Sequence, residues 1–242
     1  MLFTVSARGK PPQLGIIEFL RGEFPDLPLD HIESVFGFVE PCTLYGGRPF
    51  VQPELTQEDV RALEANRIGL RLPLSNHWAT QAEYEDYRWF LEKYHRPGNS
   101  IIVTTDKLAR WLRRDYPGYE LEASVIKEID KHAAIDQALK LYNTVVIPMR
   151  LNQDLDFLRG IEQKDRITLF ANAGCALNCP AKICYPSFSR ANKFTGHPIR
   201  CSLGEKPREL FGMLDFDLEV LQAMGFRRFK LLRTRSHGLT GF

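Results

Sequence analysis

Eight short apolar segments alternate with helical patterns along the whole chain, and this alternation constrains the fold more than any other feature. Several segments, such as Ser100-Ile-Ile-Val-Thr, are continuously apolar, which is typical of parallel strands that are buried on both faces. Strands that alternate with helices imply a parallel sheet joined by helical crossovers. The expected strands are 2–6, 34–39, 69–74, 100–104, 119–123, 144–147, 167–171 and 228–232.

The helical patterns begin and end at recognisable signals. Thr56 and Thr80 each precede a helical pattern and have an acidic residue three positions later, which predicts capping boxes. The expected helices are 57–65, 81–94, 107–116, 126–138, 154–162 and 215–224. Eight strand–helix units in 242 residues predict an α/β fold, a single TIM-like (β/α)8 barrel domain over residues 1–242. The alternative is an open doubly wound sheet, although no Gly-x-Gly-x-x-Gly follows the first strand to support its dinucleotide-binding form.

The connection after the seventh expected strand is unusually long. The starts of strands seven and eight, Ile167 and Arg228, lie 61 positions apart, whereas the other intervals between strand starts are 19 to 35 residues. This surplus predicts a cysteine-rich loop at 172–210, inserted between strands seven and eight. In barrels of this kind, the loops that leave the carboxyl ends of the strands build the active site.

Four of the five cysteines lie in this loop. Cys175, Cys179, Cys184 and Cys201 are separated by three, four and sixteen residues. The start of the chain has no secretory signal pattern, which predicts a cytoplasmic protein with reduced thiols, so the cysteines read better as metal ligands than as disulfides. Their irregular spacing favours an iron–sulfur cluster of the 4Fe–4S type, with zinc as the alternative and redox or buried structural thiols as further possibilities.

The fifth cysteine, Cys42, follows the second expected strand. In a closed barrel its loop shares one face with the loop after strand seven, so Cys42 is a candidate fifth metal ligand across the mouth. The alternative is a partly buried structural thiol. Which four of the five cysteines bind a metal is left open by spacing alone.

Polar residues at the carboxyl ends of the expected strands are candidates for substrate binding. Helix capping and turn formation are the competing explanations for several of them. A run of basic residues (Arg227, Arg228, Lys230, Arg233 and Arg235) indicates an anionic partner such as a carboxylate, a phosphate or RNA, or else a solvated strand end. The substrate-binding candidates are Arg233, Arg8, Asn172, Ser124 and Asn76.

Charge and hydropathy exclude some partners. The formal net charge is +2, so a dedicated DNA-binding function is not expected. No apolar run approaches the roughly 20 residues of a membrane-spanning helix, so no membrane association is expected.

Several segments resemble one known family in order along the chain. They are Ser34-Val-Phe-Gly, Cys42 with Arg48 beyond it, the stretch from Ser100 to Asp106, the stretch from Asp115 to Ser124, Val145-Val-Ile-Pro-Met-Arg, Cys175, and Gly225 to Arg233. The sequence resembles the peptidase U32 (collagenase-like) family. Within that family it resembles the iron–sulfur TIM-barrel proteins of tRNA hydroxylation and oxygen-independent ubiquinone hydroxylation.

The resemblance implies a cluster-binding barrel that takes part in oxygen-independent hydroxylation, or a related modification, of an aromatic or RNA-base substrate. It implies an anionic or aromatic small molecule or tRNA as partner, with a second barrel subunit as a further possible partner. The alternatives are a non-catalytic iron–sulfur or zinc subunit of a complex, and a metal-dependent peptidase. The peptidase reading is disfavoured because the chain has no His-Glu-x-x-His motif. The chain departs from the family in the seventh strand, which has no glutamate, and at Leu232, where the family has glycine.

Overall fold

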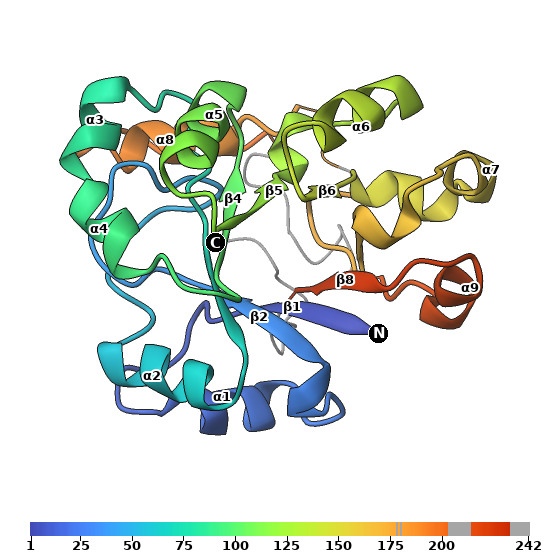
Figure 1. Cartoon of the computed structure of the whole chain (residues 1–242), viewed down its shortest axis with the longest axis horizontal. Helices are drawn as coiled ribbons and strands as arrows, with labels where there is room; N and C mark the ends of the chain where they lie inside the picture. Colours follow the sequence, from blue (N-terminus) through green and yellow to red (C-terminus); the bar gives the residue numbers. More distant parts are fainter. Residues whose placement is uncertain (178, 180, 203–213, 233–242) are drawn as a thin grey trace.

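Eight parallel strands close into a barrel in sequential order, β1 to β8 (Figure 1). The structure, a computed structural model, describes residues 1–177, 179, 181–202 and 214–232. All eight expected strands are present, and the predicted (β/α)8 barrel is confirmed. The strands are β1 Leu2–Ser6, β2 Ile32–Phe36, β3 Gly69–Leu72, β4 Ser100–Val103, β5 Glu120–Ala123, β6 Thr144–Val146, β7 Ile167–Phe170 and β8 Arg228–Leu231.

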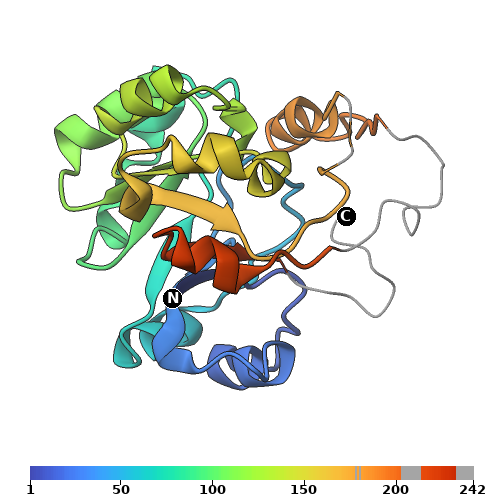
Figure 2. The same cartoon turned by 90° about the vertical axis from the view of Figure 1, so that its right-hand side faces the viewer.

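Helices surround the ring of strands, with α1 and α2 on the opposite side of the barrel from α5 and α6 (Figures 1 and 2). Among the described residues, no helix has both the length and the apolar character that a bilayer crossing requires. The short 3-10 helices are Leu29–His31, Val125–Lys127, Met149–Gln153 and Lys164–Arg166. The α-helices are α1 Ile16–Glu23, α2 Gln57–Ala65, α3 Gln81–Asp86, α4 Arg88–Lys93, α5 Asp106–Asp115, α6 His132–Leu139, α7 Leu155–Arg159, α8 Cys184–Ala191 and α9 Leu218–Ala223.

Both predicted capping boxes are present, at Thr56 with Asp59 and at Thr80 with Glu83. The single helix expected over 81–94 is wrong, because the chain breaks at Tyr87 into α3 and α4. The hydroxyl of Tyr87 accepts a hydrogen bond from the backbone N–H of Thr43 at 3.2 Å, which ties this break to the loop after β2.

The other helix predictions differ from the structure at particular points. The helix expected over 126–138 begins only at His132, because Glu128 has a left-handed backbone (φ 50°) that no α-helix continues through. Two of the described α-helices, α1 and α8, were not expected at all. Helix α8 lies in the cysteine-rich segment, so part of that segment is regular rather than a loop.

The barrel interior contains a buried polar layer as well as apolar side chains. Arg71 of β3 donates to Glu122 of β5 at 2.5 Å, and both side chains are almost fully buried. Thr144 and Thr168 also donate to Glu122, at 3.3 and 3.1 Å. These contacts join four strands at the level below the carboxyl ends, and the cavity described next lies above them.

Candidate functional site

A cavity of about 210 Å³ lies at the carboxyl ends of the strands. Residues from nearly every side of the barrel line it, including Arg8 after β1, Phe36 at the end of β2, Ser124 after β5 and Lys230 of β8. This is the end of a (β/α)8 barrel at which enzymes of this fold place their active sites. The cavity is therefore the candidate functional site.

Four cysteines line this cavity: Cys175, Cys179, Cys184 and Cys201. They act on one another electrostatically, because burial and then the charges of the other three thiolates raise the pKa of Cys184 to about 12. The structure therefore brings together the four cysteines that the sequence places in one segment. Burial, followed by the charges of Cys184 and Cys175, also raises the pKa of the neighbouring Tyr185 hydroxyl.

The four thiols are gathered around the cavity rather than packed around one point. Among the described residues, no group of three or more His, Cys, Asp or Glu side chains has the arrangement that would hold a metal ion. A tetrahedral zinc site holds its thiolate ligands at Zn–S distances of about 2.3 Å. All five cysteines of the chain are thiols in this structure.

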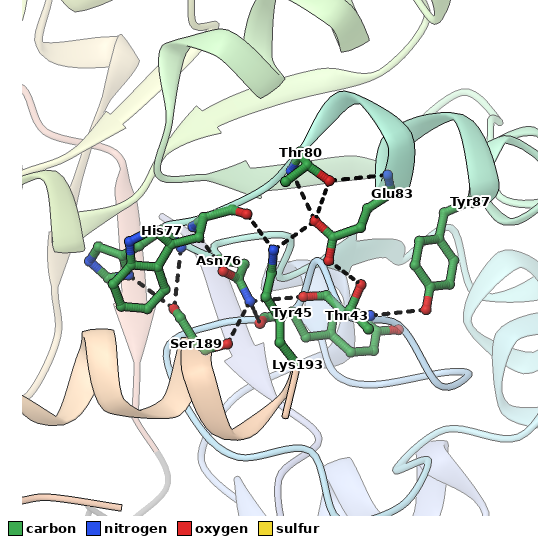
Figure 3. Close-up of polar contacts among 10 residues, drawn as sticks. Thr43, Tyr45, Asn76, His77, Thr80, Glu83, Tyr87, Ser189 and Lys193 are labelled. Carbon is green, nitrogen blue, oxygen red and sulfur yellow. Dashed lines mark hydrogen bonds and ion pairs between the residues drawn. The ribbon is translucent and has the colours of Figure 1, made fainter. Parts of the chain in front are cut away.

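The position of Cys184 depends on α8, which begins at that residue. Asn76, in the loop after β3, donates its side-chain amide to the carbonyl of Ser189 at 2.9 Å (Figure 3). The same amide lies 2.8 Å from the carbonyl of Thr43 and 3.2 Å from that of Tyr45. Asn76 thus fixes α8 against the loops after β2 and β3, and it acts as a positioning residue.

Further contacts hold the end of α8 in the same place. His77 donates its backbone N–H to the Ser189 hydroxyl at 3.3 Å, and its ring nitrogen Nδ1 lies 3.0 Å from that hydroxyl (Figure 3). Lys193 forms an ion pair with Glu83 of α3 at 2.6 Å. Asn192 donates to the carbonyl of Arg48 at 3.0 Å. A helix from the cysteine-rich segment is therefore attached to the opposite side of the barrel.

Replacing Asn76 with alanine is expected to lower the free energy of unfolding by about 1–3 kcal/mol, because it leaves buried carbonyls without their donor. Urea unfolding followed by circular dichroism measures this change. Asn66→Ala is the matched control, since the Asn66 amide caps the exposed end of α2 through one bond to Ala62. Its expected cost is within about 0.5 kcal/mol. Equal losses in the two variants would contradict the anchoring role of Asn76.

Three of the basic residues that line the cavity differ in how their charge is balanced. Arg48 forms a bidentate ion pair with Glu54, with both N–O distances at 2.5 Å. Lys182 pairs with Glu128 at 2.6 Å. Lys230 is 8% exposed and has no carboxylate within ion-pair distance among the described residues. Its charge is thus the one least compensated of these three.

Of the other sequence candidates, Cys42 and Asn172 do not line the cavity. Cys42 is buried in the apolar core and is not among the residues that line the cavity; burial raises its pKa to about 12. Asn172 is buried and exchanges two hydrogen bonds with the backbone of Leu232, at 2.9 and 2.8 Å, which joins the ends of β7 and β8. Arg233 lies outside the described residues.

Ser124 combines the two roles considered for it. Its hydroxyl accepts a hydrogen bond from the backbone N–H of Ile126 at 3.3 Å, which caps the 3-10 helix Val125–Lys127, and the residue also lines the cavity. Sequence reasoning missed the cavity positions of Lys182 and of the aromatic residues Tyr185 and Phe188. For Lys230, the sequence gives one indication of its position. Side chains alternate between the two faces of a strand, so Arg228 and Lys230 lie on the same face of β8.

Comparison with known proteins supports the fold. No family model matches the sequence, and no curated protein matches it significantly. Among solved structures, the chain is similar to one described as the U32 peptidase Mk0906, with a TM-score of 0.65 and 11% sequence identity. The similarity covers 98% of this chain and 94% of that one. The chain therefore has the fold of that U32 protein over almost its whole length, and at this identity the likeness extends to the fold alone.

Proposed function

We propose that this chain is an iron–sulfur protein that takes part in oxygen-independent hydroxylation, or a related modification, of an aromatic or RNA-base substrate. The observation that carries the proposal is the convergence of Cys175, Cys179, Cys184 and Cys201 on one cavity at the carboxyl end of the barrel. The sequence resemblance to the iron–sulfur branch of the U32 family supports the same function.

The donor set fits a cluster better than a single ion. Thiolates are the ligands that hold 4Fe–4S clusters in proteins, and four of them are present here. A cluster is larger than one ion, so its ligands stand further apart than those of zinc. This is consistent with thiols that line a cavity without forming a compact ion site. When bound, such a cluster supplies one-electron redox chemistry.

The chain's own residues would do the rest. Burial by Tyr185 and Phe188 would shield the ligands from water, and α8 would hold Cys184 in place through the contacts of Asn76. The cavity beside the thiols would hold the substrate next to Arg8 and Ser124. The word peptidase in the description of Mk0906 concerns that protein, and no observation on this chain favours hydrolysis.

Anaerobic purification with quantitation of iron, sulfide and zinc tests the proposal. Wild-type protein is expected to be brown and to contain about four iron and four sulfide ions per chain. Alanine in place of any one of the four cavity cysteines is expected to lower the iron content to a small fraction of that value. Thermal unfolding of each metal-free variant shows whether the barrel is still folded.

Cys42→Ala is the matched control, because Cys42 is a buried cysteine outside the cavity. It is expected to retain its iron and sulfide. A colourless wild-type protein that binds one zinc ion would overturn the proposal. Loss of iron in Cys42→Ala with retention in Cys201→Ala would instead identify a different set of four ligands and refute the set proposed here.

A further inference from the structure

Lys230 is a buried amine that faces the candidate cavity. It lies in the middle of β8, where it pairs in register with Thr4 of β1 and Phe170 of β7. The side chain is more than nine-tenths buried, yet it lines the cavity. Its Nζ lies 4.5 Å from the centre of the Phe36 ring, which also lines the cavity. The face of an aromatic ring attracts a cation but does not neutralise it.

Among the described residues, no carboxylate forms an ion pair with Lys230, although the charge of Glu122 acts on it. Glu122 is held by Arg71 at 2.5 Å, and Glu33 is shared between Arg71 and Arg228. Among the described residues, this interior group therefore carries three positive charges and two negative charges. Its members are Lys230, Arg71, Arg228, Glu122 and Glu33. A buried ionic charge without a partner is costly, so an anion that enters the cavity would be attracted to this position.

The walls of the cavity limit what such an anion can be. Phe36, Ile102, Met149 and Phe170 line it together with Lys230, and all four are apolar. Arg48 also lines it, but its guanidinium is held at both nitrogens by Glu54. Among the described residues that line the cavity, Lys230 is the buried cation without an ion pair, while Arg8 is only partly buried. A single buried ammonium suits one monovalent negative charge, whereas phosphate groups are bound by clusters of donors or by arginine forks. The volume of about 210 Å³ suits a small molecule.

We infer that Lys230 binds the carboxylate of a small organic acid whose apolar body packs against Phe36 and the neighbouring apolar walls. This inference deepens the proposed function, because it assigns the substrate class and its anchoring residue in the same cavity. It rests on the proposed function only for that location, since neither the charge nor the walls of this subsite depend on a cluster.

Titration of Lys230 supports the assignment. Burial, opposed by Glu122 and reinforced by Arg71 and Arg48, lowers the pKa of Lys230 to about 8. These groups act from β5, from β3 and from the segment after β2. The amine is protonated below that pH, and a bound carboxylate would stabilise the protonated form. The affinity for a carboxylate is therefore expected to fall as the pH rises through about 8.

Binding of benzoate to the full-length chain, measured by calorimetry before and after anaerobic reconstitution with iron and sulfide, tests the inference. Benzoate is expected to bind wild type, and Lys230→Met is expected to weaken binding by about 10- to 100-fold. Lys164→Met is the matched control, because Lys164 also lies over an aromatic ring, that of Phe226 at 5.8 Å, but is not a cavity residue. It is expected to bind benzoate like wild type.

Three outcomes with benzoate and its neutral analogue would overturn the inference, and a fourth comes from phosphate. The first three are no binding of benzoate to wild type, equal binding by wild type and Lys230→Met, and equal binding of benzoate and the neutral benzamide. The cluster proposal fails separately: a chain that takes up no iron but binds benzoate through Lys230 refutes the cluster and retains the carboxylate site. Inorganic phosphate is the last probe, and tighter binding of phosphate than of benzoate would contradict the carboxylate assignment.

Discussion

Replacing Glu122 with glutamine is expected to lower the free energy of unfolding by about 3–5 kcal/mol at pH 7. The carboxylate of Glu122 is fully buried and bonds to Arg71, Thr144 and Thr168. Without the charge of Glu122, Arg71 retains, among the described residues, only its 3.2 Å ion pair with Glu33, and the buried Lys230 loses the negative charge that opposes its desolvation. Urea unfolding of the purified variant, followed by circular dichroism and tryptophan fluorescence, measures the change.

The loss of unfolding free energy in Glu122→Gln is expected to depend on pH in one direction. Burial acts to raise the pKa of Glu122, but the charges of Arg71 and Lys230 prevail and lower it below the ordinary value of 4.5. A lowered carboxyl pKa contributes stability that is fully present above 4.5 and is lost as the pH falls through the folded-state pKa. The difference between wild type and Glu122→Gln is therefore expected to shrink in acid.

A surface pair provides the control for Glu122. Glu64 bonds to Arg96 at 2.6 Å, but more than half of each side chain is exposed. Glu64→Gln is expected to change the free energy of unfolding by less than about 1 kcal/mol, as exposed ion pairs contribute little. A similar small change for Glu122→Gln would show that the buried charge layer does not stabilise the barrel as described.

Replacing Lys230 with methionine is expected to stabilise the protein by about 3 kcal/mol at pH 7. The pKa of Lys230 falls from 10.5 to about 8, so folding places a charged amine where its charge is less favourable than in water. Methionine has a similar length and no charge, and it packs against the apolar walls of the cavity. The same unfolding measurement, made without added ligand, tests this expectation.

This gain also depends on pH. A lysine with a lowered pKa destabilises the folded state below that pKa, and the cost disappears as the pH rises from about 8 to 10.5. The advantage of Lys230→Met over wild type is therefore expected to be largest below pH 8 and nearly absent at pH 10.5. A variant that is less stable than wild type at pH 7 would contradict the conclusion that the buried charge of Lys230 destabilises the folded state. A gain in stability that does not change with pH would show that better packing, and not the removed charge, causes the gain.

The strands could be predicted because strands that are buried on both faces consist of consecutive apolar residues. Parallel strands in a barrel are covered on both faces, so runs such as that of β4 stay apolar without interruption. Helix α1 shows where this kind of evidence ends. Its first residue, Ile16, donates its backbone N–H to Asp59 of α2 at 2.8 Å, in place of a local capping side chain. A cap supplied by a residue 43 positions away leaves no local pattern.

The site was predictable to a similar degree. The clustering of four cysteines in one overlong connection predicted a candidate site, and the structure brings those four to one cavity. In the sequence, Lys230 was one of several basic residues near the end of the chain. Which of them faces the cavity became clear only from the residues that each one contacts in the structure. Arg228 reaches Glu33 near the other end of the barrel, whereas Lys230 faces the cavity. Asn76 was expected near the site, but its role is to hold α8.

Because α8 is attached to the far side of the barrel, the arrangement of the cavity cysteines depends on the barrel staying closed. Cys175 follows β7, while Cys184 moves with a helix that is fastened to the loops after β2 and β3. The two thiols therefore belong to opposite walls of the same cylinder. An expansion of the barrel that moves these two sides apart would separate Cys175 from Cys184 even while the strands remain hydrogen-bonded. If the four thiols bind a cluster, as proposed above, that cluster would connect the two sides of the barrel, and its loss is expected early in unfolding.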